Sequence, residues 1–145
     1  MNICDSLRLG VATRTPAGTQ ALAEEFAGSL PVDATLALHG DLGSGKTTWV
    51  QGLARGFGIA EPVTSPTFML YHLHRGGTRM LAHLDAYRLE RPDQFEGLLL
   101  EEFLESPWCL AVEWPEKVAG WLPPDTWHLD LAIARDGSHT IRLRP

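Results

Sequence analysis

The stretch HGDLGSGKTT at residues 39–48 constrains the fold more than any other part of this sequence. Residues 40–47 fit the pattern G-x-x-x-x-G-K-[ST], in which backbone N–H groups surround phosphates, the lysine reaches the terminal phosphates and the hydroxyl ligates Mg²⁺. The glycines allow positive φ angles, and the helix that follows offers unpaired N–H groups and a positive dipole end. We therefore predict a nucleotide site formed by Asp41, Leu42, Gly43, Ser44, Gly45, Lys46, Thr47 and Thr48.

The residues around the loop have the order that such a site requires. The apolar run 34–40 predicts a buried strand entering the loop, and residues 46–58 predict a helix leaving it. The helix has apolar side chains at a 3.6-residue period and glycines at its end, namely Trp49, Val50, Leu53, Ala54 and Phe57, then Gly56 and Gly58. A glycine-rich turn without a ligand is the alternative, and this context makes it the weaker interpretation.

Composition limits the class of protein. A chain of 145 residues is expected to form one domain, residues 1–145, without disulfides, because Cys4 and Cys109 are two isolated cysteines. No run of 18 apolar residues occurs, so we expect a soluble cytoplasmic protein with no membrane contact. The net charge of −6 argues against unaided binding to a nucleic-acid backbone. Residues 135–145 gather basic side chains, which we interpret as a solvated edge strand.

The remaining elements predict an α/β fold. Residues 15–30 suggest a helix with Thr15 as N-cap and Leu22, Ala23, Phe26 and Leu30 facing inward. Residues 92–105 predict an amphipathic helix with Phe95, Leu98, Leu99, Phe103 and Leu104 on one side. Strands are expected within 108–115, where Cys109 is a small core residue, and twice within 126–145, the second strand lying at the edge of the sheet. This order predicts a P-loop NTPase-like three-layer sandwich whose mixed sheet has a parallel centre and antiparallel strands at the margin.

Residues 68–87 predict a hairpin with a two-residue turn at Gly76-Gly77. Strict alternation then places His72, His74 and His83 on one face with Asp85. A metal site is one interpretation of three histidines on one face. We favour a polar sheet face, because cross-strand diagonals lie near ~7 Å and no convergent ligand geometry is evident.

Two predicted strands end in an acid, at Asp85 and at Glu113. Ligands of open α/β sheets bind at the carboxyl ends of strands, where Mg²⁺ needs a carboxylate and hydrolysis needs a group that positions water. We expect Asp85 to be the acid that positions the water or is linked to Mg²⁺, and Glu113 to complete the metal shell with Thr47. Turn-capping at a strand end is the structural alternative. Thr67, in the segment VTSPTF, is expected to sense the γ-phosphate as switch segments do.

Together the motifs HGDLGSGKTT, VTSPTF, HLDAYRL and VEWPEK resemble the TsaE (YjeE) family of small bacterial P-loop ATPases over residues 36 to 117. The resemblance implies a role in forming threonylcarbamoyladenosine in tRNA, with a TsaD–TsaB partner complex. The acidic balance of the chain leads us to expect that tRNA is contacted only indirectly, through those partners. The resemblance further implies ATP and Mg²⁺ as cofactors, phosphate and metal binding by Lys46 and Thr47, and a catalytic centre that includes Thr67, Asp85, Glu113 and Trp114. No function is implied for residues 135–145.

Other functions stay open on the residues alone. A guanine-specific GTPase normally carries an Asn-Lys-x-Asp motif, and Asn2 is the only asparagine here, which favours ATP. A small-molecule kinase needs an acceptor pocket and a lid, and we find no segment for either. A nucleotide-gated scaffold with incidental hydrolysis is a third possibility. We expect a weak ATPase that needs its partner complex, with Arg88 either assisting in cis or forming a surface ion pair.

Overall fold

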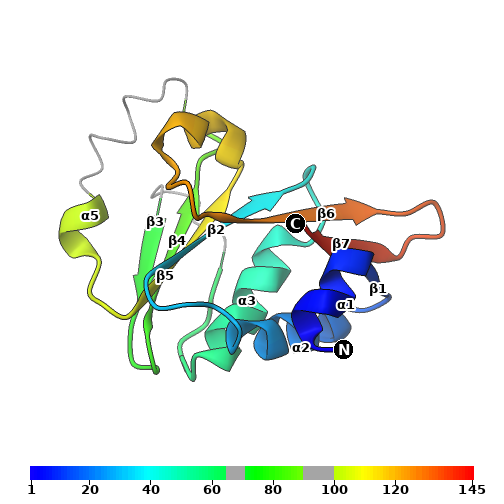
Figure 1. Cartoon of the computed structure of the whole chain (residues 1–145), viewed down its shortest axis with the longest axis horizontal. Coiled ribbons are helices and arrows are strands. Elements are labelled where there is room, and N and C mark those ends of the chain that lie inside the picture. The colour runs from blue at the N-terminus through cyan, green and yellow to red at the C-terminus, as the bar shows by residue number, and fades with distance from the viewer. Residues whose placement is uncertain (65–70, 90–99) are drawn as a thin grey trace.

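The structure, a computed structural model, describes residues 1–64, 71–89 and 100–145. In these ranges seven strands form one sheet in the order β1-β7-β6-β2-β5-β4-β3. Figure 1 shows the sheet between helices α1 to α3 on one face and the elements η1 and α5 on the other. The elements are α1 (Ile3–Leu9), β1 (Val11–Thr13), α2 (Pro16–Ala27), β2 (Ala34–His39), α3 (Lys46–Gly56), β3 (Tyr71–His74), β4 (Met80–Asp85), α5 (Leu100–Phe103), β5 (Trp108–Glu113), η1 (Pro115–Trp121), β6 (Trp127–Ile133) and β7 (His139–Leu143).

The centre of the sheet is parallel and its margins are antiparallel. Strand β2 pairs in parallel with β5 and β6, and β4 pairs in parallel with β5. Strands β3, β7 and β1 add to the two sides in antiparallel orientation. This arrangement confirms the predicted α/β sandwich with a mixed sheet, and it brings the carboxyl ends of β2, β4 and β5 to one edge.

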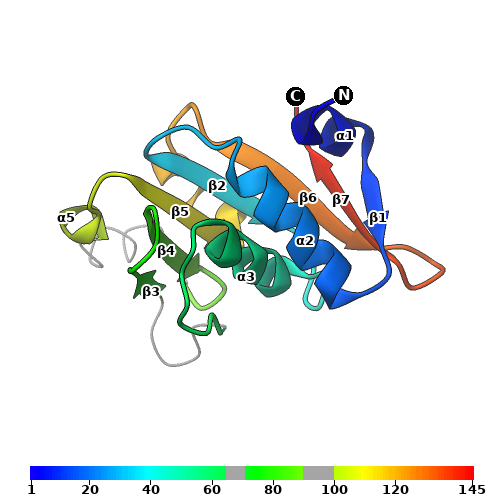
Figure 2. The same cartoon turned by 90° about the horizontal axis from the view of Figure 1, so that it is seen from below.

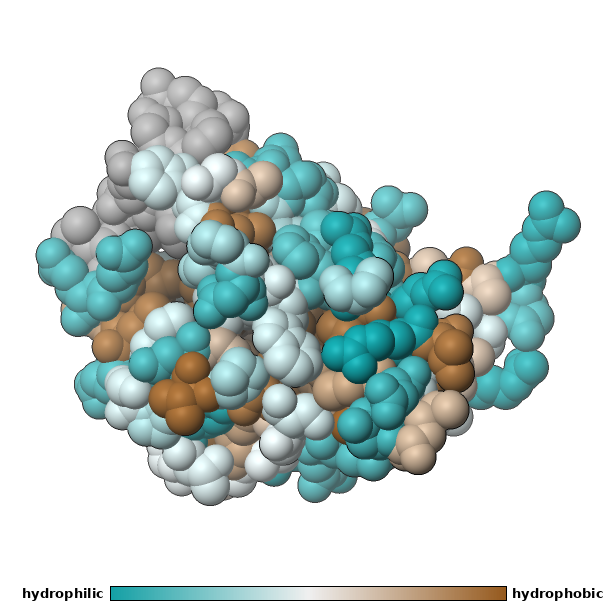
Figure 3. Space-filling view, in the orientation of Figure 1, coloured by the Kyte–Doolittle hydropathy of each residue, from teal (hydrophilic) through white to brown (hydrophobic). Residues whose placement is uncertain are grey.

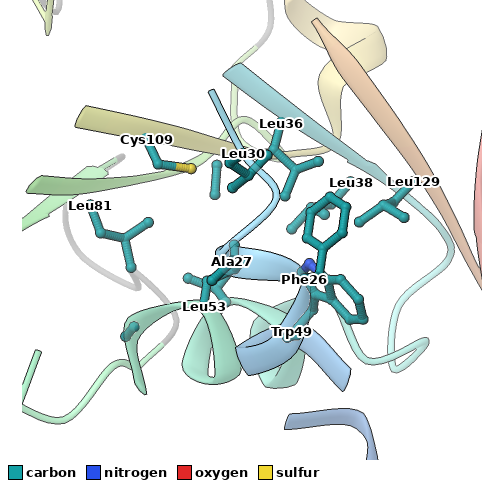
Figure 4. Close-up of a cluster of buried hydrophobic side chains, with 14 of the residues drawn as sticks. Phe26, Ala27, Leu30, Leu36, Leu38, Trp49, Leu53, Leu81, Cys109 and Leu129 are labelled. Atoms are coloured by element: carbon teal, nitrogen blue, oxygen red, sulfur yellow. The ribbon is translucent and has the colours of Figure 1, made fainter. Parts of the chain in front are cut away.

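The main core lies between the sheet and helices α2 and α3, which Figure 2 shows side by side against β2, β5 and β6. The rings of Phe26 and Trp49 pack with their centroids 5.5 Å apart, and Leu36, Leu38 and Leu129 point toward them from the strands (Figure 4). Thr15 caps α2 as predicted, accepting the N–H of Gly18. Apolar burial at this scale is the main stabilising term of such a domain.

Helix α3 approaches α2 closely because glycine lies at the contact. A Cβ atom on Gly52 would stand 2.4 Å from the carbonyl oxygen of Gln20, and one on Gly56 would stand 2.6 Å from the Cβ of Ala27. Real Cβ atoms essentially never approach other heavy atoms to less than 3.0 Å. The position of α3, and with it the loop at its N-terminus, therefore depends on these glycines.

A second core fills the opposite face of the sheet, with Ala82, Leu84, Leu100, Leu110, Val112 and Val118 buried together. The predicted core role of Cys109, on the α3 face, is confirmed, since the residue is fully buried and burial raises the pKa of its thiol to about 12. Of the helix predicted at 92–105, residues 90–99, including Phe95, Leu98 and Leu99, lie outside the described residues. Phe103 is 46% exposed, so its predicted inward orientation is wrong.

The hairpin prediction is correct in position and wrong in its turn. Tyr71 pairs with Leu84 and His74 with Leu81, so a longer loop at 75–79 replaces the two-residue turn. The cause is a contact with the end of α3, where the N–H and the hydroxyl of Thr78 both donate to the carbonyl of Phe57. The register moves by two residues, which leaves the predicted faces unchanged.

The C-terminal strand β7 is not an edge strand, because β1 pairs with it on its outer side. The prediction missed both β1 and the preceding helix α1, which begins with a capping box between Asn2 and Asp5. None of the helices in the described ranges has the length and apolar character needed to cross a membrane.

Candidate functional site

The P-loop runs from Gly40 to Gly45 between β2 and α3. Gly43 and Gly45 have φ angles of 82° and 107°, which L side chains rarely adopt. Gly45 caps α3 without a side-chain hydrogen bond, so the first N–H groups of the helix have no capping side chain. A Cβ on Gly43 would meet nothing within 4 Å, so the outer side of the loop is open to a ligand.

Lys46 is 4% exposed, at the first position of α3. Its Nζ donates to the carbonyl of Gly40 at 2.6 Å and lies 3.5 Å from the centre of the Trp114 ring. Burial lowers the pKa of this ammonium, and the carboxylates of Glu113 and Asp85 partly oppose that shift. The lysine is thus held inside the loop by a carbonyl that a phosphate oxygen can replace.

Thr47, His83 and Glu113 meet next to Lys46. We refer to these four residues as the strand-end cluster. The hydroxyl of Thr47 donates to Oε2 of Glu113 at 3.0 Å, and Nε2 of His83 contacts the same oxygen. Glu113 is 4% exposed and His83 is fully buried. A buried carboxylate costs much free energy unless it is hydrogen-bonded or paired with a cation, and this one is hydrogen-bonded by Thr47 and contacted by His83.

Asp85 ends β4 directly beside Glu113, its register partner at the end of β5. Its Oδ1 accepts the N–H of Tyr87 at 3.0 Å, which fixes the carboxylate at the start of the following turn. The residue therefore caps a turn, as the structural alternative expected, and also stands at the strand ends, as the functional hypothesis expected. The two roles are compatible because a carboxylate has two oxygens.

Trp114 follows Glu113 in a left-handed conformation, with φ 58° and ψ 52°. For a bulky residue this conformation costs about 1–3 kcal/mol and persists only when the surroundings impose it. Its ring packs over Lys46 and lies 5.0 Å from the ring of Tyr87. The sequence placed Trp114 near the centre by resemblance, and the structure gives it a contact there.

The structure brings together most of the residues that the sequence singled out. Lys46, Thr47, Asp85, Glu113 and Trp114 converge, whereas Asp41 and Leu42 are exposed at the tip of the loop and Thr48 is half-buried. Arg88 is exposed, and Thr67 lies outside the described residues.

Sequence reasoning missed one participant. His83 was interpreted as part of a polar sheet face, but both His83 and His74 are buried. The useful signal was its position two residues before Asp85, which places both side chains on the α3 face of β4.

A second group of polar residues lies on the opposite face of the sheet, and we call it the β6–β7 cluster: His39, His128, Asp130 and Arg144. Nε2 of His39 and Nδ1 of His128 are 2.8 Å apart, and Arg144 binds Asp130 through two hydrogen bonds of 2.8 Å. Burial, followed by the charge of Arg144, lowers the pKa of both histidines, and the Arg144 hydrogen bond lowers the pKa of Asp130. Figure 3 shows hydrophilic residues over this part of the molecule.

The basic C-terminal stretch is largely engaged within the chain. Besides the Arg144 pair, Arg142 donates to the carbonyl of Arg8, and Nδ1–H of His139 donates to the carbonyl of Ser44 in the P-loop. These contacts give residues 139–144 a structural role that the charge pattern alone did not show.

The residues at the loop fit nucleotide phosphates and Mg²⁺. They combine an ammonium, an uncapped helix N-terminus, a hydroxyl and two carboxylates, which is the donor set of such a site. Among the described residues, Oγ of Ser44 is buried without a hydrogen-bond partner. A cavity of about 260 Å³ borders the loop, lined by Gly40, Asp41, Ser44, Leu131, Ala132 and Ile133.

The fold and this site define a P-loop protein of the mixed α/β type. Residues 13–141 match the family model described as threonylcarbamoyl adenosine biosynthesis protein TsaE. The chain therefore belongs to the TsaE family, as the four sequence motifs indicated.

Relatives and a solved structure agree with this assignment. Over 122 residues the chain is 39% identical to the tRNA threonylcarbamoyladenosine biosynthesis protein TsaE of Nostoc sp., covering 81% of this chain and 74% of the relative. The protein of the same name from Bacillus subtilis is 38% identical over 125 residues, or 86% and 77% of the two chains. The crystal structure of Bacillus subtilis YdiB superposes with a TM-score of 0.75 at 30% identity and covers 92% of this chain and 82% of that one.

Proposed function

We propose that this chain binds and slowly hydrolyses ATP with Mg²⁺, as an accessory protein in the threonylcarbamoyl modification of adenosine in tRNA. The observation that carries the proposal is the strand-end cluster, in which a buried ammonium, a hydroxyl and a buried carboxylate meet at the mouth of a phosphate-binding loop. The names of the relatives supply the pathway.

In this proposal Lys46 exchanges the Gly40 carbonyl for phosphate oxygens, and the loop N–H groups bind the same phosphates. The hydroxyl of Thr47 donates a hydrogen bond to Glu113, so the lone pairs of the Thr47 oxygen are available to Mg²⁺. Glu113 contributes the negative charge that retains the metal. Bound Mg²⁺ supplies neutralisation of the charge that develops on the phosphates. Asp85, with its orientation fixed by the N–H of Tyr87, positions the attacking water.

We further propose that the isolated chain is slow and becomes competent when docked on a TsaD–TsaB-type complex. Leu42 at the loop tip is 83% exposed and Tyr87, beside Trp114, is 56% exposed, so the mouth of the site offers apolar contacts to a partner. A partner can also add charge at the transition state, and one arginine supplied in trans raises the rate by about 10³ to 10⁵ in other phosphoryl-transfer systems. The net charge of −6 favours partners as the source of tRNA affinity.

The experiment that tests this proposal measures ATP hydrolysis and tRNA modification by the reconstituted set of proteins, with and without this chain. We expect slow hydrolysis by the chain alone, at least about tenfold stimulation by partners, and modification that requires the chain. Brisk turnover that partners leave unchanged would contradict the proposal. Full modification with Glu113→Gln, which keeps the shape and loses the charge, would instead identify a nucleotide-gated scaffold whose hydrolysis is incidental.

A further inference from the structure

In the part of the chain that the structure describes, the hydrogen-bonding contact of His83 is with Glu113. His83 pairs in register with Ala111 of β5, and Glu113 lies two residues further along β5 on the same face. The small side chain of Ala111 leaves room for the imidazole to cross diagonally to the carboxylate. The histidine is fully buried, and its contact is Nε2 to Oε2 of Glu113.

The direction of this hydrogen bond follows from the chemistry of the two partners. An ionised carboxylate only accepts hydrogen bonds, and Oε2 of Glu113 accepts the hydroxyl proton of Thr47. Nε2–H of His83 therefore donates to the same oxygen. Among the described residues nothing pairs with Nδ1 of His83, and a buried N–H without an acceptor is costly. The tautomer that fits is the one with its proton on Nε2.

We infer that His83 is a positioning residue for Glu113. It fixes the carboxylate in the orientation that also receives Thr47, so that the hydroxyl and the acid reach the metal as one unit. The inference rests on the proposed function, because it assigns His83 a part in the Mg²⁺ dependence of that same site. Mutation of the partners that orient metal ligands typically costs about 10–100-fold in metal affinity or activity.

Two substitutions separate positioning from filling of the core. His83→Leu keeps a similar volume and removes the donor. His83→Gln places an amide N–H within reach of the same oxygen. A matched control is His72→Leu, which removes the histidine directly opposite on β3, where the ring packs against His74.

The measurement is the Mg²⁺ dependence of the chain. For His83→Leu we expect kcat to fall and the Mg²⁺ concentration for half-maximal turnover to rise, each by at least about tenfold. The KM for ATP at saturating Mg²⁺ is expected to stay within about threefold, because the P-loop is intact. His83→Gln recovers a large part of both losses, and His72→Leu behaves like the parent. A folded His83→Leu chain with the parental Mg²⁺ dependence would overturn the inference, as would equal losses in the leucine and glutamine variants.

Calorimetry gives a readout that needs no turnover. In the absence of Mg²⁺, ADP should bind His83→Leu and the parent with affinities within about threefold, whereas Mg²⁺ should tighten ADP binding in the parent much more than in the variant. Unchanged tightening in the variant would also overturn the inference. If the parent with its partners hydrolyses no ATP, the proposed function fails, and this binding comparison still tests His83.

A second measurement applies if His83→Leu does not fold. Nitrogen NMR of the parent should show His83 as the Nε2–H tautomer, and Glu113→Gln should shift those signals. The opposite tautomer, or signals indifferent to Glu113→Gln, would overturn the inference.

Discussion

The strand-end cluster and the β6–β7 cluster contain the same kinds of polar side chain. They differ in how completely their charged groups are paired within the chain and in how deeply those groups are buried. Each contains imidazole, carboxylate and a basic side chain. In the β6–β7 cluster Asp130 and Arg144 satisfy one another through two hydrogen bonds, the histidines bond to each other, and the Asp130 and Arg144 side chains are 44% and 46% exposed. In the strand-end cluster the charges are buried, and within the described part of the chain the partners of Lys46 are a loop carbonyl and an aromatic face. Burial with incomplete pairing, rather than the presence of charged groups, distinguishes a binding site from a structural polar cluster.

Among substitutions that test this comparison, we expect the largest effect from replacing Lys46. Lys46→Ala should weaken ATP–Mg²⁺ binding by about 100-fold, since charge-assisted hydrogen bonds are worth roughly 1.5–3 kcal/mol each. Calorimetric titration measures the change. The matched control is Lys117→Ala, which removes the other lysine, an exposed one in η1, and leaves binding unaltered. Parental affinity in Lys46→Ala would mean that the loop holds no phosphate.

The next effect concerns the two acids. Glu113→Gln and Asp85→Asn should each lower ATP turnover by at least about tenfold and leave nucleotide binding within a few-fold, because each keeps its shape and loses a charge needed in the chemical step. Steady-state hydrolysis with the partner complex gives the rates. Asp130→Asn, an acid of the β6–β7 cluster, should stay within about twofold of the parent. Wild-type turnover in an acid variant would assign that acid a structural role.

A smaller effect is expected on stability in the β6–β7 cluster. The pKa of Asp130 is lowered by the Arg144 hydrogen bond, so its contribution is present above the unfolded value of 3.8 and disappears as the pH falls through the lower folded value. Because both side chains are more than one-third exposed, Asp130→Asn should cost only about 0.5 kcal/mol at pH 7. Urea unfolding at pH 7 and pH 3.5 tests this, and a cost that does not shrink at the lower pH would contradict it.

The smallest effect should come from the paired histidines. Burial lowers the pKa of both His39 and His128 below 6.5, so they contribute stability above pH 6.5 that is lost as the pH falls toward their folded values. Replacing His128 by Gln should flatten the fall in Tm between pH 7 and pH 5 by about 1 °C. A steeper fall in the variant would show that protonation at His128 favours the folded state.

The sequence predicted what is local and missed what depends on register. The P-loop and the two strand-end acids follow from residues adjacent in the chain, and the structure places them as expected. The contact of His83 with Glu113 requires the alignment of β4 with β5, which periodicity does not define. The hairpin register likewise depends on Thr78 bonding to Phe57, 21 residues away. The strand β1 was missed because three residues give too short a pattern to recognise.

The close approach at Gly52 extends the functional footprint of the site to a position that contacts no phosphate. Any side chain at this position meets the backbone of α2, so the whole of α3 must shift to accommodate it. Lys46 and Thr47 lie at the N-terminus of α3 and shift with it. A mutational scan scored on nucleotide binding would therefore report Gly52 as intolerant to every replacement. If the packing of α3 on α2 were ignored, Gly52 would be mistaken for a nucleotide-binding residue. Its side of α3 contacts helix α2 and has a structural role.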